Sequence, residues 1–173
     1  GSLGLSANSS DTNLVPLAGF TFGGSGSNRT VTVLPATNAF GAVTITITVT
    51  DTNGSSASLA FVLVVDPVND APEISAIANQ TVNEDTNGLT VAFAVADLET
   101  PASNLVVTAR SSNQGLVPDA HLVLGGTGTN RTLALAPLAN ANGAATITLT
   151  LRDAGGLAAS AAFVLTVNAV NDP

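Results

Sequence analysis

An internal repeat with a constant offset of 102 residues is the feature that most constrains the fold of this chain. When the sequence is shifted by 102 positions, Leu3–Asp70 falls on Leu105–Asp172 without a gap, and about half of the 68 pairs are identical. Self-similarity of this kind is typical of tandem structural units. The full unit is Ala71–Asp172, and the first copy lacks the counterpart of Ala71–Asn104. We therefore expect one incomplete and one complete unit.

Alternating sequences predict that both copies consist of β-strands. In Ala42–Thr50, Val43, Ile45, Ile47 and Val49 share one face and four threonines share the other. The returning strand Ala57–Val65 would turn Leu59, Phe61, Leu63 and Val65 inward. The complete copy adds two earlier strands, Ile74–Val82 and Leu89–Ala96. Seven short strands separated by Gly- and Asn-rich turns, without a helical apolar stripe, favour a β-sandwich, and a small barrel is the second choice.

Composition excludes several classes of protein. The net charge is -8 and the four basic residues are all arginines, so the chain lacks the basic surface that binds nucleic acid. There is no cysteine, which excludes disulfides and thiolate metal sites. No apolar run reaches the roughly 20 residues of a membrane-spanning helix, so we expect no membrane insertion by this segment.

Acidic residues concentrate where the two copies meet. Seven of the twelve lie between residues 66 and 99, a range without arginine: Asp66, Asp70, Glu73, Glu84, Asp85, Asp97 and Glu99. A divalent cation would relieve the repulsion between these carboxylates. Calcium takes oxygen ligands of the kind present here, whereas the lack of Cys and the single His argue against zinc or copper. The alternative is that these are ordinary solvated turn residues.

The residues at this junction resemble a known family. Asp66-Pro67-Val68-Asn69-Asp70-Ala71-Pro72 is similar to the Asp-x-Asn-Asp-Asn-Ala-Pro linker of cadherins and bacterial cadherin-like repeats. The turns with Asn83-Glu84-Asp85-Thr86, Asp97-Leu98-Glu99, and Asp51 and Asp153 extend the resemblance over nearly the whole chain. It looks closest to the tandem cadherin-like or immunoglobulin-like repeats of large bacterial surface adhesins. The resemblance implies an all-β chain of tandem Greek-key β-sandwich repeats: an incomplete first repeat (1–65), an acidic linker (66–72) and a complete repeat (73–173).

The resemblance also implies a ligand set for a junction calcium ion. Carried over residue by residue, this set is Asp66, Asn69, Asp70, Asp97, Glu99 and Asp153. Glu84 would serve the next junction, together with Asn171 and Asp172. The Asn and Asp of the linker are shifted by one place relative to the family pattern, and Glu99 replaces an Asp. These departures imply fewer ions or weaker binding than in vertebrate cadherins.

The function that follows is structural. We expect a non-catalytic repeat module of an extracellular or cell-surface adhesin or stalk, with neighbouring repeats as partners and calcium as the stiffening ion. His121 stands without a nucleophile or orienting group, so no catalytic site is expected and His121 is interpreted as a surface strand residue. Alternatives are a carbohydrate- or protein-binding module with a glycan or protein receptor, and an accessory domain of a secreted hydrolase. The incomplete copy would expose sheet edges, which raises the further hypothesis of homophilic or strand-exchange self-assembly into filaments.

Overall fold

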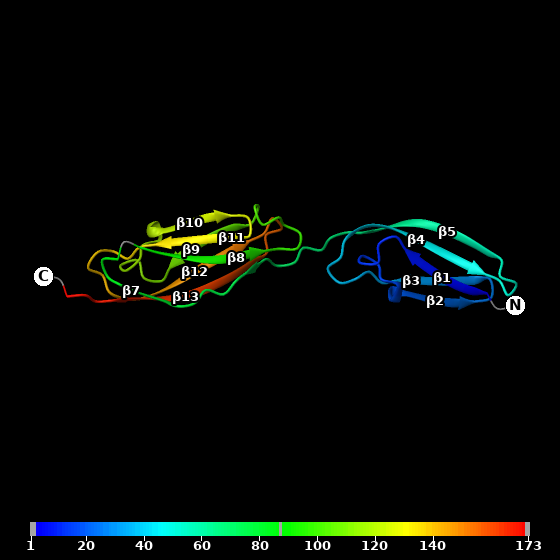
Figure 1. Cartoon of the computed structure of the whole chain (residues 1–173), viewed down its shortest axis with the longest axis horizontal. Helices are drawn as coiled ribbons and strands as arrows, with labels where there is room; N and C mark the ends of the chain where they lie inside the picture. Colours follow the sequence, from blue (N-terminus) through cyan, green and yellow to red (C-terminus); the bar gives the residue numbers. More distant parts are fainter. Residues whose placement is uncertain (1–2, 87, 172–173) are drawn as a thin grey trace. The chain divides into compact units, whose positions relative to one another are not determined.

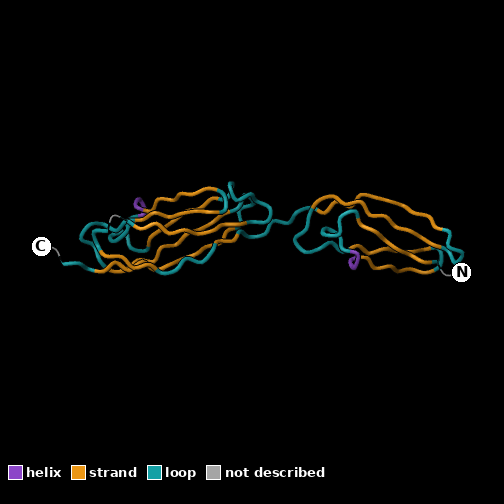
Figure 2. Tube along the Cα trace, viewed as in Figure 1, coloured by secondary structure: helices purple, strands orange, loops and turns teal. Residues whose placement is uncertain are grey.

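A computed structural model describes residues 3–86 and 88–171 and divides the chain into two units, Gly1–Val68 and Asn69–Pro173 (Figure 1). Almost all regular structure is β-strand, and the described helical segments are two short 3-10 turns (Figure 2). The all-β prediction is confirmed. None of the described helical segments has the length and apolar character needed to cross a bilayer.

The second unit is a sandwich of two four-stranded sheets. The first sheet has the order β10-β11-β8-β6, comprising β10 (Leu122–Thr127), β11 (Asn130–Leu135), β8 (Leu89–Ala96) and β6 (Glu73–Ile74). The second has the order β7-β13-β12-β9, comprising β7 (Gln80–Asn83), β13 (Ala158–Asn168), β12 (Gly143–Arg152) and β9 (Val106–Ser111). Neighbouring strands are antiparallel except β7 and β13, which are parallel. The short helix η2 (Asp119–His121) precedes β10.

The core of the second unit follows from the alternation of apolar residues in its strands. On β12, Ile147, Leu149 and Leu151 share one face and are fully buried, whereas Thr146, on the other face of the same strand, is exposed. Side chains from both sheets meet in one cluster, to which β8 adds Val91, Phe93 and Val95 and β13 adds Phe163, Leu165 and Val167. Period two therefore places one face of each sheet against the other, as in other sandwiches.

The first strand of this unit differs from the prediction. Instead of one strand over Ile74–Val82 there are two short ones, β6 and β7, which belong to opposite sheets, so the sandwich has eight strands and not seven. Side-chain hydrogen bonds account for the switch. Ser75 Oγ accepts the Ala94 N–H on one sheet at 2.9 Å, and Asn79 Oδ1 accepts the Val164 N–H on the other at 2.8 Å.

The first unit contains fewer strands. One sheet has the order β1-β4-β5, formed by β1 (Gly4–Ser9), β4 (Gly41–Thr50) and β5 (Ser56–Val65). The other is the hairpin of β2 (Phe20–Ser25) and β3 (Asn28–Val33), preceded by the short helix η1 (Leu17–Gly19). Among its described residues, the buried apolar ones are Leu14, Val15, Val43 and Ile45. Among the described residues of this unit, 3–68, no strand corresponds to β6, β7 or β8.

The prediction that β5 turns four apolar residues inward holds only in part. Leu63 and Val65 pack partly buried against the small core, but Leu59 is 71% exposed and Phe61 is 39% exposed. These two residues are exposed because, in the part of this unit that the structure describes, no strand takes the place that β8 has in the second unit.

Candidate metal site

Three segments of the second unit meet near its first residue. They are the chain entering the unit at Asn69, the turn that follows β8 from Asp97, and the turn between β12 and β13 from Asp153 to Leu157. The polar side chains of these segments are joined by hydrogen bonds described below. They include five of the seven residues that the sequence assigns to a metal.

Asp97 shapes the turn after β8. Its Oδ1 accepts the N–H groups of Glu99 at 3.0 Å and Thr100 at 2.5 Å, which is the usual way that an Asp side chain closes a turn. Its Oδ2 is buried and has no hydrogen-bond partner among the described residues. A buried carboxylate oxygen without a donor is costly, because it has lost water and gained nothing in return.

Asn69 and Asp153 tie the incoming chain to the β12–β13 turn. Asn69 Nδ2 donates to Asp153 Oδ2 at 2.8 Å, while Asp153 Oδ1 accepts the Leu157 N–H at 2.8 Å. Asp153 is buried, with 7% of its surface exposed. The Asn69 side chain lies so close over Gly155 that a Cβ there would sit 2.6 Å from it. Glycine is thus needed at this position for the approach of Asn69.

Glu99 and Thr100 complete the connection. Glu99 Oε2 accepts the Asp70 N–H at 3.1 Å, and Thr100 Oγ1 accepts the Ala154 N–H at 3.3 Å. Thr100 is 4% exposed. Each of the three segments is therefore bonded to another, and protein N–H groups already occupy one oxygen of Glu99 and both oxygens of Asp153.

The remaining two predicted ligands are Asp66, which belongs to the first unit, and Glu84. Glu84 lies apart, after β7, where its Oε1 accepts the Val170 N–H at 2.6 Å and its Oε2 accepts from Asn142 Nδ2 at 3.2 Å. Asn171 is exposed, and Asp172 is outside the described residues. Within the described ranges no three His, Cys, Asp or Glu side chains converge as a ready-made metal cluster.

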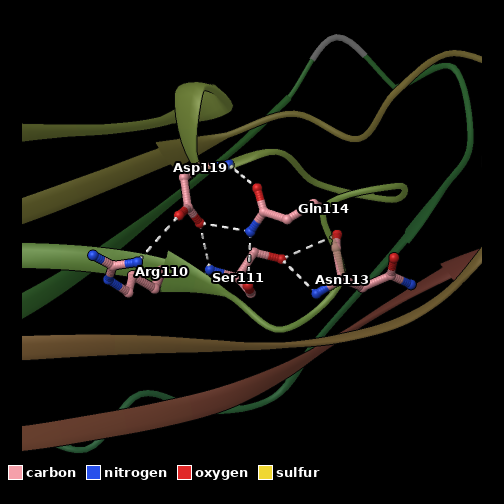
Figure 3. A network of polar contacts seen from close by, with 5 residues as sticks. All are labelled: Arg110, Ser111, Asn113, Gln114 and Asp119. Carbon is pink, nitrogen blue, oxygen red and sulfur yellow. Dashed lines mark hydrogen bonds and ion pairs between the residues drawn. The ribbon is translucent and has the colours of Figure 1, made fainter.

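A second polar network braces the loop between β9 and η2 (Figure 3). Asp119 Oδ1 accepts the Ser111 N–H at 2.8 Å and Gln114 Nε2 at 2.9 Å, and Gln114 Oε1 accepts the Asp119 N–H at 2.9 Å. Arg110 Nη1 lies 4.0 Å from the other carboxylate oxygen. The Ser111 and Gln114 hydrogen bonds lower the pKa of Asp119 below its ordinary value of 3.8; desolvation opposes them, and the charge of Arg110 adds the smallest contribution in the lowering direction. Sequence reasoning missed this network because its members carry no motif.

Arg131 and His121 have local roles. Arg131 Nε donates to the Gly128 carbonyl at 2.8 Å, and its Nη2 donates to the Ala102 carbonyl at 2.7 Å. His121 is exposed, as expected, but it ends η2 and is not part of a strand, so the strand assignment was wrong. Its Nδ1 lies 3.0 Å from the Ala136 carbonyl oxygen. A hollow of about 350 Å³ on β9 and β12 is lined by Thr, Ser and Arg side chains, without an aromatic ring on which a sugar could stack.

Comparison with known proteins supports the fold. No family model matches the chain. No curated protein matches it either. Among solved structures, a protocadherin gammaB7 EC3-6 cis-dimer aligns with 98% of the chain at 21% identity and a TM-score of 0.60. Human mucin-like protocadherin EC1-2 aligns with 97% at 17% identity and a TM-score of 0.60, and protocadherin gamma B2 extracellular cadherin domains 1-5 align with 97% at 17% identity and 0.57.

The chain spans 41% of the gammaB7 structure, 34% of the gamma B2 structure and 85% of the mucin-like protocadherin structure. At these levels of identity the similarity concerns the fold. The chain therefore has the β-sandwich architecture seen in cadherin domains.

Proposed function

We propose that this chain is a non-catalytic structural repeat module of an extracellular adhesin or stalk, and that calcium bound at the start of the second unit stiffens the connection between its units. The observation that carries the proposal is the buried, unpartnered Oδ2 of Asp97. It belongs to a turn that is already hydrogen-bonded to the incoming chain, so a cation held there would act directly on the linker residues Asn69 and Asp70.

The chemistry of the surrounding groups suits a hard cation. Asp97, Glu99 and Asp153 offer carboxylate oxygens, and Asn69 offers an amide oxygen, which are the ligands that calcium takes. Calcium would compete with the N–H groups that now bond to the oxygens of Glu99 and Asp153. Asp66, which precedes Asn69 by three residues, would supply a further carboxylate from the linker. Glu84 is proposed for an equivalent role beside residues 168–171.

The location and partners follow from the same reasoning. The matched protocadherin gamma B2 structure comprises extracellular cadherin domains 1-5, which is several such domains in one chain. We extend this arrangement to the present chain: an extracellular or cell-surface position with neighbouring repeats as partners. A chain without cysteine cannot use disulfides to stabilise such a stalk, and metal ions are another way to do so.

Calorimetric titration with calcium, together with thermal unfolding in calcium and in excess chelator, tests the proposal. At a free calcium concentration 100 times Kd, binding to the folded state alone stabilises it by roughly 2.7 kcal/mol, which raises Tm by several degrees. We expect Asp97→Asn to abolish this shift. The substitution keeps an oxygen that can accept the turn N–H groups and removes the charge.

Asp51→Asn is the matched control. Asp51 is the counterpart of Asp153 in the first unit, and its Oδ1 closes the same kind of turn by accepting the N–H groups of Asn53 and Ser55, both at 2.8 Å. The Asp51→Asn variant should show the same calcium-dependent rise in Tm as the unmodified chain. Equal heats and equal Tm in calcium and chelator for the unmodified chain would reject the metal and leave a repeat module held by hydrogen bonds alone.

A further inference from the structure

The dipeptide Asn-Gly occurs at three places in the sequence: Asn53-Gly54, Asn87-Gly88 and Asn142-Gly143. In this dipeptide the backbone nitrogen of glycine can attack the side-chain amide carbon of asparagine, because glycine has no Cβ to hinder the approach. In a folded protein the rate of this attack depends on how firmly the fold holds the amide and the backbone around it. Asn87 lies outside the described residues, so only the other two dipeptides are compared.

The fold holds Asn142-Gly143 at both reacting groups. Asn142 Nδ2 donates to Glu84 Oε2 at 3.2 Å, and Glu84 is 7% exposed. Gly143 is the first residue of β12 and lies opposite Val167 of β13. The glycine nitrogen can therefore reach the amide carbon only after a charge-assisted hydrogen bond and the start of a strand pair have opened.

Asn53-Gly54 is held much less firmly, because it lies in the turn between β4 and β5 and outside both strands. Both residues are exposed, and Gly54 has a φ of 87°. In the described part of the chain the Asn53 side-chain amide makes no hydrogen bond, and the Gly54 N–H is held by a single bond of 3.2 Å to the Asp51 carbonyl. A turn at the tip of a ribbon opens locally at a small cost in free energy. The Gly54 nitrogen is thus released far more often than that of Gly143.

We propose that Asn53 is a site of spontaneous deamidation in the first unit and that the fold protects Asn142 from the same reaction. The deprotonated Gly54 nitrogen bonds to Asn53 Cγ, the Cγ–Nδ2 bond breaks, and the leaving nitrogen takes up a proton and departs as ammonia. The product is a cyclic succinimide. Water then opens this ring: addition at Cγ gives aspartate, and addition at the backbone carbonyl carbon gives isoaspartate. One water is consumed and one ammonia is released, without oxidation or reduction.

The modification would change the turn in which it occurs. Isoaspartate places an additional carbon in the main chain before Gly54, whereas Asp51 Oδ1 now accepts the N–H groups of Asn53 and Ser55, both at 2.8 Å. The longer main chain cannot keep both of these bonds, and either product adds a negative charge beside the Asp51 carboxylate. In the second unit Gly155 stands at the position of Asn53, so the equivalent turn cannot react in this way. The reaction therefore loosens the end of the β4–β5 ribbon alone.

Peptide mapping by mass spectrometry, after incubation of the full chain in mildly alkaline buffer, tests the inference. We expect first-order conversion of Asn53 into both aspartate and isoaspartate, at least about tenfold faster than any conversion of Asn142. Chelator is present throughout, so the result does not depend on the proposed calcium site. The peptide that contains Asn87 is mapped separately. Incubation of the same chain in urea is the control, because without the fold the rates at Asn53 and Asn142 should agree within about threefold.

Three variants of the chain identify the cause. Asp51→Ala frees two N–H groups of the turn and should speed conversion of Asn53 at least about threefold, with no change at Asn142. Glu84→Ala removes the partner of the Asn142 amide and should speed conversion of Asn142 alone. Asn53→Ser cannot react. Hydrogen exchange at residues 51–56 should therefore stay constant in this variant during incubation and rise in the unmodified chain as product accumulates.

Three results would overturn the inference. The first is an equal rate at Asn53 and Asn142 in the folded chain. The second is a difference between the two rates that persists in urea, because the local sequence and not the fold would then be its cause. The third is aspartate as the sole product at Asn53, because direct hydrolysis by water would then replace the attack by the Gly54 nitrogen.

Discussion

The strands that the two units share place matching residues in different surroundings, so that residues buried in one unit are exposed in the other. Phe61 and Phe163 are identical in the repeat, but their exposed fractions are 39% and 2%. Ile47 is half-buried, whereas its counterpart Leu149 is fully buried. The difference arises because the second unit also has β6, β7 and β8. Burial is thus a property of the facing strand as much as of the residue itself.

The largest expected difference in stability is between alanine substitutions of Phe163 and of its counterpart Phe61. Phe163→Ala should destabilise the second unit by about 3–5 kcal/mol, since it leaves a cavity in a closed core. Phe61→Ala should cost the first unit only about 1–2 kcal/mol, because the side chain is already partly in water. Hydrogen exchange resolved by residue measures both units in one sample. Equal losses would show that the first unit is closed in solution.

The two β-hairpins provide a position where the units should behave alike. Gly24 and Gly126 have φ of 79° and 80°, and a Cβ would lie 2.3 Å and 2.5 Å from the Asn28 and Asn130 carbonyl oxygens. Alanine at either position should cost roughly 3 kcal/mol, at the upper end of the range for a strained backbone. Unequal losses in denaturant unfolding would contradict the shared geometry of these turns.

Glu84 has no counterpart in the first unit and should matter to the second alone. Glu84 is 7% exposed, and its carboxylate accepts hydrogen bonds from the Val170 N–H and Asn142 Nδ2. Glu84→Ala removes two charge-assisted hydrogen bonds and should destabilise the second unit by about 2 kcal/mol in chelator. Exchange rates in the first unit serve as the internal control. A change in those rates would mean that the effect is not local.

The smallest expected difference between the units is in the pH dependence of their stability. Asp119 contributes to it in the second unit only, because its counterpart in the first unit is Leu17. The pKa of Asp119 is lower in the folded unit than its ordinary value of 3.8, chiefly through the Ser111 N–H. The folded state therefore binds this proton less readily than the unfolded state does. Its stabilisation is complete above pH 3.8 and is lost as pH falls through the folded pKa.

Asp119→Asn should remove that part of the acid destabilisation of the second unit. Unfolding in urea between pH 2 and 6 would measure it, with Asn113→Ala as a control that keeps the carboxylate. The same pH dependence in Asp119→Asn and in the unmodified chain would show that the network has no linkage to folding.

The sequence predicted the strands with clear alternation better than it predicted their partners. Period two placed β4, β5 and β8 correctly, because alternation directly reflects a two-sided strand. It joined β6 to β7, because the Ser75 and Asn79 hydrogen bonds that move the chain between sheets depend on strands distant in sequence. The alternation also predicted that Phe61 would be buried, because the sequence of one strand does not reveal whether a facing strand is present to cover it.

In the candidate metal site, too, the local sequence predicted the residues but not their contacts with distant segments. A resemblance in the linker and turns selected Asn69, Asp70, Asp97, Glu99 and Asp153, and the structure brings the segments that hold them together. The pairing of Asn69 with Asp153 across 84 positions, and the fit of Asn69 over Gly155, arise from the fold and have no local signature. Asp119 and Gln114 were missed for the same reason.

The central claim is that the start of the second unit binds calcium through the turn of Asp97, and amide NMR during a calcium titration tests it most directly. We expect saturable shifts and slower exchange at residues 69–72, 97–100 and 153–157. The equivalent turn of the first unit, residues 51–55, should not respond, and Asp97→Asn should abolish the changes. Equal small shifts in both turns, unaffected by Asp97→Asn, would contradict the claim and reduce the acidic cluster to solvated turns.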